Sequence, residues 1–156
     1  MSRIYTVATS GAVTVAVDLL EATPADDKPV RLRGFVISQT TEVKDAEEEC
    51  LEISVVRFSG AFTGGSGGSA PVPATLDSAD VAAGVVTEVR NTTQATGGTA
   101  TTLYIYGWNE RATPFEVWYP DDSYCPIVKQ NEALVVKSTA PADSVTIQTT
   151  FILEEM

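Results

Sequence analysis

The sequence predicts an all-β protein, a single antiparallel β-sandwich of the jelly-roll type with one short helix. Two observations lead to this fold class: short β-branched segments with alternating apolar residues outnumber every other pattern, and turn residues separate them. In addition, no heptad or fixed-period repeat is present, which argues against coiled coils and solenoids. A domain of this size buries roughly 70% of its unfolded surface, enough for one core. We therefore expect one domain over residues 1–156 with eight to ten strands.

Seven segments are predicted strands because their residues are β-branched or aromatic and mostly alternate in polarity. In the first, valines alternate with Thr14 and Ala16, and in the second the apolar run is broken at Gly34, which we interpret as a β-bulge. The last segment has the most regular alternation of all. The predicted strands are residues 13–17, 30–37, 50–58, 103–108, 115–119, 133–138 and 145–153.

The connections between these strands carry recognisable turn chemistry. Residues 23–29, 119–122 and 140–143 each combine Pro with Asp, as type I turns prefer. The single helix candidate is residues 77–83, with Asp77 or Ser78 as its N-cap and Gly84 at its end.

Residues 59–70 are rich in Gly and Ser, a composition typical of flexible linkers. A domain boundary there would leave too few strands on each side to close a sandwich, so we interpret the stretch as a long loop within one domain. No Lys-Ser or Lys-Thr pair follows the glycines, which argues against a phosphate-binding loop. We expect this loop to be a contact arm that becomes ordered in an assembly.

Charge and composition exclude several classes of function. The chain has 10 Lys and Arg against 21 Asp and Glu, a net charge of −11, which disfavours nucleic acid and anionic lipid as partners. It has no His, so Ser-His and Cys-His dyads are absent. We therefore expect a protein that is not an enzyme, with no catalytic, cofactor-binding or metal-binding residues. No apolar run reaches membrane-spanning length and no signal peptide is evident, which predicts a soluble protein made in the cytoplasm.

Two features leave alternatives open. Asp45, Glu47, Glu48 and Glu49 form an acidic cluster that is either a solvated loop or a weak divalent-metal site, since hard cations prefer several oxygen ligands. Cys50 and Cys125 are interpreted as two buried thiols, with a disulfide as the alternative.

The densest apolar feature is a group of aromatic residues in the second half of the chain. Such residues form either a core and subunit interface or, when exposed on one sheet face, a platform for stacking carbohydrate. We favour the core and interface. Exposure of Trp108 and Trp118 distinguishes the two possibilities, because a carbohydrate-binding module presents both side chains on one face, whereas a core buries them. The aromatic residues are Tyr104, Tyr106, Trp108, Phe115, Trp118, Tyr119 and Tyr124.

Several turns and one loop also carry a resemblance. They are PADDKP at 24–29, GGSGGSAP at 64–71, the 77–84 segment, EVRNTT at 88–93 and APADSVTI at 140–147. Taken together, they resemble a group of small proteins encoded by tailed bacteriophages and prophages. The resemblance covers most of the chain and implies a virion structural protein, a capsid decoration or cement protein that binds the major capsid protein lattice.

The resemblance also implies a location on the capsid exterior after synthesis in the host bacterial cytoplasm, and self-association, with a trimer preferred and a dimer open. We expect the aromatic strands, the N-terminal strand and the glycine loop to supply the contacts. The first alternative is a carbohydrate-binding β-sandwich on a phage head fibre or tail, and the second is a small carboxylate hydrolase. The predicted interface residues are Ile4, Tyr5, Val7, Gly64, Gly65, Gly67, Gly68, Tyr106, Trp108 and Trp118.

Overall fold

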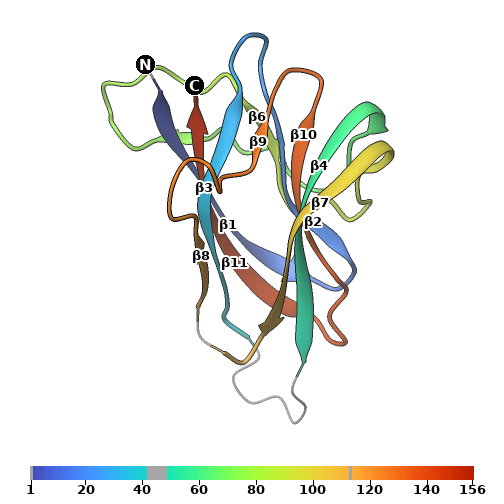
Figure 1. The fold of residues 1–156 in the computed structure, drawn as a ribbon. Helices are drawn as coiled ribbons and strands as arrows, with labels where there is room; N and C mark the ends of the chain where they lie inside the picture. The colour runs from blue at the N-terminus through green and yellow to red at the C-terminus, as the bar shows by residue number, and fades with distance from the viewer. Residues whose placement is uncertain (1, 42–48, 113) are drawn as a thin grey trace.

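A computed structural model describes residues 2–41, 49–112 and 114–156, and the described chain is all-β (Figure 1). None of its described residues is helical. Its strands are β1 (Arg3–Val13), β2 (Val17–Thr23), β3 (Val30–Gln39), β4 (Cys50–Thr63), β5 (Ala74–Thr75), β6 (Val86–Glu88), β7 (Thr96–Asn109), β8 (Phe115–Trp118), β9 (Ile127–Val128), β10 (Ala133–Ser138) and β11 (Val145–Glu155).

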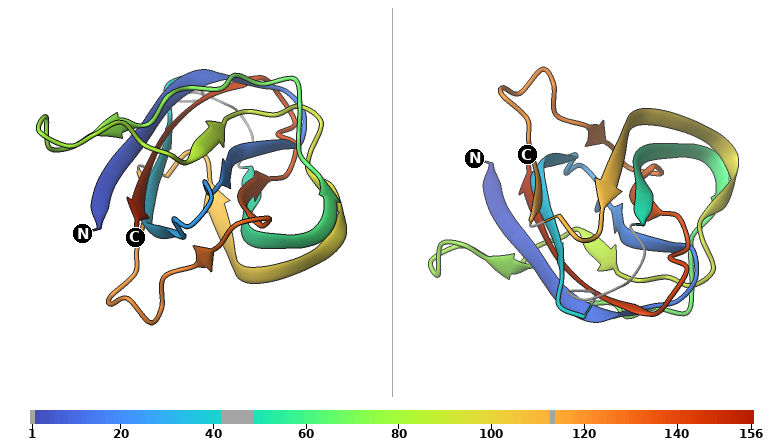
Figure 2. Two further views of the ribbon diagram at one scale, coloured as in Figure 1. Left: turned by 90° about the horizontal axis from the view of Figure 1, so that it is seen from above. Right: turned by 90° about the horizontal axis from the view of Figure 1, so that it is seen from below.

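The strands form two antiparallel sheets that enclose a common interior (Figure 2). Sheet A has the order β5-β1-β11-β3-β8, and β9 pairs with β3 beside β8. Sheet B has the order β6-β2-β10-β4-β7. Consecutive strands β1 and β2 lie in different sheets, as do β3 and β4, so the chain repeatedly crosses from one sheet to the other.

The main core lies between the sheets and receives side chains from both. Phe35 of β3 contacts Phe151 of β11 within sheet A and Tyr106 of β7 across the sandwich, with ring centroids 5.8 and 6.2 Å apart. Each fully buried apolar side chain of this kind contributes about 1.5–3 kcal/mol to stability. A second, smaller cluster, which includes Phe58 and Val135, packs beneath Phe62.

Most predicted strands are confirmed. The segment at 133–138 coincides with β10, and those at 30–37, 50–58, 103–108 and 145–153 lie within β3, β4, β7 and β11. The β-bulge predicted at Gly34 is also confirmed, because the β3–β11 register shifts there: Ile152 pairs with Gly34 and Leu153 with Leu32.

The strand predicted at 13–17 is wrong, because this segment is the corner between the two sheets. Val13 ends β1 and Val17 begins β2, and both are 1% exposed, whereas Val15 is 42% exposed. The two outer valines fill the core from opposite sides of the corner. The alternation of valines with Thr14 and Ala16 in the sequence therefore runs through residues that are not in a strand.

The helix predicted at 77–83 is also wrong. Asp77 accepts hydrogen bonds from the Ala79 N–H at its side chain (2.9 Å) and from the Asp80 N–H at its carbonyl (3.1 Å), which makes a single turn. The chain beyond it forms tertiary hydrogen bonds instead: the Gly84 and Val85 N–H groups both donate to Glu155 Oε1 at 2.7 Å. An Asp side chain can accept a backbone hydrogen bond at an isolated turn as well as at the start of a helix, so the sequence does not distinguish the two structures.

The two cysteines do not pair. Cys125 is buried, as expected, but Cys50 is exposed at the start of β4, so the prediction of two buried thiols is wrong for Cys50.

Candidate functional site

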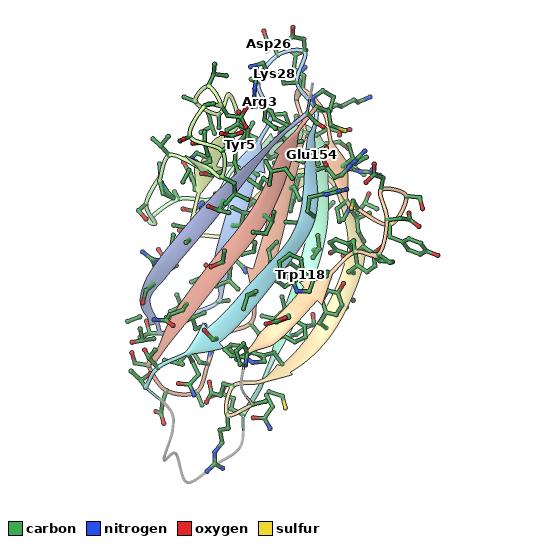
Figure 3. The ribbon with its side chains drawn as sticks, turned by 90° about the vertical axis from the view of Figure 1, so that its left-hand side faces the viewer. Arg3, Tyr5, Asp26, Lys28, Trp118 and Glu154 are labelled. Carbon is green, nitrogen blue, oxygen red and sulfur yellow. The ribbon has the colours of Figure 1, made fainter. Side chains whose placement is uncertain are left out.

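The outer face of sheet A presents a broad uncharged surface. Outward residues paired across the sheet form two neighbouring rows, in which the only charged side chain is Glu116. The first row is Ala74, Thr6, Ile152, Gly34 and Trp118, and the second is Ala8, Thr150, Val36 and Glu116. We call these nine residues the Trp118 face; Figure 3 looks onto sheet A and labels Trp118. The face thus has one charged side chain on a chain of net charge −11.

Trp118 is held in place on this face. Its ring lies over Gly34, where an added Cβ would be 2.7 Å from Trp118 Cε3 and 2.5 Å from the Val117 carbonyl. Its indole Nε1–H donates to Glu116 Oε2 at 3.2 Å. The side chain is nevertheless 56% exposed. The glycine thus lets a large aromatic ring lie across the sheet with much of its surface open to solvent.

An ion-pair network borders the Trp118 face at one end. Arg31 Nη1 lies 2.7 Å from Asp122 Oδ2 and 3.2 Å from Glu154 Oε2, and Arg33 Nε lies 3.3 Å from Glu154 Oε2. Arg33 also pairs with Asp122 and, with Arg31, holds the pKa of that carboxyl below its usual range. An uncharged centre with a charged border matches the anatomy of protein interfaces.

An aromatic groove of about 350 Å³ opens between the edges of the sheets and adjoins the Trp118 face, because Glu116 and Trp118 also line it. Tyr104 and Tyr106 of β7 stack with centroids 6.0 Å apart, and Tyr119 contacts Tyr104 at 5.1 Å. The Tyr104 hydroxyl donates to the Tyr124 carbonyl at 2.8 Å. Burial raises the pKa of the Tyr119 hydroxyl above its ordinary value. We call this space, lined also by Phe115, the aromatic groove.

A polar depression of about 430 Å³ adjoins the aromatic groove and shares Tyr104 and Tyr124 with it. Its other lining residues include Arg57, Asp122 and Ser123. Together the two spaces provide aromatic faces beside charged and hydroxyl groups, the combination that saccharide sites use.

The glycine loop is held against its own chain. Residues 59–63 belong to β4, so the loop begins at Gly64. The Gly65 N–H donates to Glu21 Oε2 at 2.7 Å, and the Gly68 N–H donates to Asn91 Oδ1 at 3.2 Å. A Cβ at Gly64 would be 2.6 Å from Glu21 Oε1, and Gly67 has a φ of +87°. That this loop is a contact arm of an assembly stays a prediction.

Two buried carboxylates support this loop. Asp18 is fully buried, accepts a hydrogen bond from the Ala95 N–H at 2.7 Å and lies 3.9 Å from Lys137 Nζ. Burial raises its pKa to about 6, and burial also raises the pKa of Glu21. Sequence patterning missed both, because the loop covers the outer face of β2 and every residue from Val17 to Ala22 is buried.

The structure separates the predicted interface residues into two groups. Tyr5, Val7 and Trp108 are at most 2% exposed and belong to the core of a single chain, whereas Ile4 is 36% exposed beside the Trp118 face. Tyr106 lines the aromatic groove. Since Trp108 is buried and Trp118 exposed, the two tryptophans do not form a row on one face.

The described residues contain neither a metal-binding cluster nor a membrane-spanning helix. No group of three His, Cys, Asp or Glu there could hold a metal ion, and Asp45, Glu47 and Glu48 lie outside the described residues. No helix there is long and apolar enough to cross a membrane.

No protein-family model, curated protein or solved structure matches this chain. The resemblance to small phage proteins therefore rests on the turn and loop segments described above.

Proposed function

We propose that this protein is a non-enzymatic structural protein of a tailed-phage virion, a decoration or cement protein that binds the major capsid protein lattice on the capsid exterior. The observation that carries the proposal is the Trp118 face. It is a five-stranded surface with one charged side chain, Glu116, and an exposed Trp, the residue type most enriched among binding hot spots.

The charge distribution supports docking by apolar contact rather than by ionic attraction. Each chain carries a net charge of −11, so neighbouring copies on a capsid repel one another. The Trp118 face has a single carboxylate, Glu116, whose side chain is already bound to the indole of Trp118. Added salt should therefore leave attachment unchanged or strengthen it, because it screens the repulsion between copies.

The order of the strands supports the finer proposal that the sandwich is a jelly roll, a fold used by viral capsid and lectin domains. Without the short strands β5, β6 and β9, the order is β1-β11-β3-β8 in one sheet and β2-β10-β4-β7 in the other. This is the arrangement that two interleaved Greek keys produce. Fold alone does not assign function, so the Trp118 face remains the carrying observation.

The test is a titration of the purified protein onto capsids of the encoding phage from which this protein has been stripped. We expect saturable binding that Trp118→Lys reduces at least about tenfold, since it removes a hot-spot ring and buries a charge. Val86→Lys, a matched change at a 62% exposed residue on the short strand β6 of sheet B, should bind as the wild type does. Equal binding of both variants, or no binding by the wild type, would reject the proposal.

The aromatic groove favours one second candidate, a carbohydrate-binding protein of a head fibre or tail. Tyr104 and Tyr124 lie where the aromatic groove meets the polar depression, which suits a sugar ring stacked on an aromatic face. Tyr124 is 55% exposed and can be replaced without opening the core. Glycan-array binding that is lost in Tyr124→Ala and kept in Ala8→Lys, a change on the Trp118 face outside the groove, would support this candidate over capsid decoration.

A further inference from the structure

The free edge of sheet B is formed by β7, the outermost strand of that sheet in the described chain. Its 14 residues contain no charged residue and no proline, and residues 96–102 are all exposed. Soluble proteins usually protect a long edge with charges, proline or a covering segment, since its unpaired backbone groups recruit other strands. We call the unpaired side of Thr96–Asn109 the β7 edge.

The chain covers its other long edge. The outer side of β1 carries β5 at Tyr5 and Thr6. Further along β1, the Arg90 side chain approaches Gly11 so closely that an added Cβ would lie 2.5 Å from Arg90 Nε. The edge of β1 is thus covered by other parts of the chain, whereas the β7 edge is left open.

We propose that the β7 edge pairs antiparallel with the β7 edge of a second copy about a two-fold axis, which joins the two B sheets into one continuous sheet. Strand length selects this partner. The other strands at sheet ends, β5, β6 and β8, have 2, 3 and 4 residues, so only β7 offers a ladder that matches β7. The pairing selects the dimer over the trimer.

Charge also favours a second copy at this edge. Two chains of net charge −11 repel each other over most of their surfaces. At the β7 edge they meet without placing any two carboxylates of the strand opposite each other, because Thr96–Asn109 has none. Screening by salt should therefore tighten the dimer.

The β7–β4 register locates the axis. It shifts between Val55 and Val56 and again between Ser59 and Phe62, so β7 is regular over the four residues 99–102 that lie between these shifts. This run is exposed on both faces and centred near Thr101. A two-fold axis there places threonines of the two copies beside each other, and cross-strand threonine pairs stabilise sheets.

The test is sedimentation equilibrium of the full chain, without capsids, from micromolar to near-millimolar concentration. We expect reversible association to twice 16.5 kDa. Thr101→Glu places like charges across the axis and should raise the dimer dissociation constant about tenfold or more. The control is Gln148→Glu, which adds the same charge on the exposed face of β11 and should leave the dimer unchanged.

Hydrogen exchange gives a second readout that does not depend on variants. Alternate amides of residues 99–102 should become protected at high protein concentration and exchange fast on dilution. A monomer at every concentration, a trimer, or a dimer that Thr101→Glu leaves intact would overturn the inference. None of these outcomes bears on capsid binding through the Trp118 face, which the titration above measures separately.

Discussion

Replacing Asp18 with Asn should remove a defined part of the pH dependence of stability. The folded protein holds the pKa of this buried carboxyl at about 6, whereas the ordinary value is 3.8. The difference corresponds to about 3 kcal/mol of unfolding free energy. Because the folded-state pKa is raised, this contribution is fully present below pH 3.8 and is lost as the pH rises through about 6.

The assay is urea unfolding followed by tryptophan fluorescence between pH 4 and 8, with the buried Trp108 as the reporter. The wild type should lose stability across this range, and the curve of Asp18→Asn should be flatter by up to about 3 kcal/mol. Glu21→Gln should flatten the same region, since burial raises that pKa too. Parallel curves for the wild type and Asp18→Asn would refute the burial of an Asp18 carboxylate beneath the glycine loop.

Two further substitutions and one labelling experiment test separate parts of the structure. Gly34→Ala should destabilise the protein by about 1–3 kcal/mol and shift the emission of Trp118, because the new Cβ meets the Val117 carbonyl and the indole. In chemical denaturation its control is Gly107→Ala, where a Cβ meets nothing within 4 Å, and an equal loss there would contradict the packing described. Gly68→Ala should lower the free energy of unfolding by about 1–3 kcal/mol, since its Cβ would overlap the Val89 carbonyl. Hydrogen exchange should show that the glycine loop is released, and unchanged exchange in the loop would contradict its packing against the Val89 segment. Of the two thiols, Cys50 should react with an aromatic disulfide reagent in the folded state and Cys125 only on unfolding, whereas simultaneous reaction would contradict their burial.

The strands could be predicted from the sequence wherever one face is buried and the other exposed. β11 and β3 follow this pattern, and the glycine of the β3 bulge was recognisable because a bulge favours Gly. The corner at Val15 was missed because alternation continues through it. The lone turn at Asp77 was missed because the same residue caps helices and turns.

The candidate site was harder to predict from the sequence than the strands were. Trp118 and Trp108 both lie in aromatic strands, yet one is exposed and the other buried, because each strand's orientation in its sheet decides which way a side chain points. The Trp118 face combines residues of β1, β3, β5, β8 and β11, and only the strand order brings them together. The exposed β7 edge likewise follows from topology, because nothing local shows that β7 lies at the end of its sheet.

The proposal that this protein decorates a phage capsid is tested most directly by a cryo-electron microscopy map of the particles that carry its gene. We expect density for this β-sandwich on the capsid exterior, with the outer face of sheet A and Trp118 against the major capsid protein. Absence of the protein from the particle, or a bound orientation in which the Trp118 face points to solvent, would contradict this proposal.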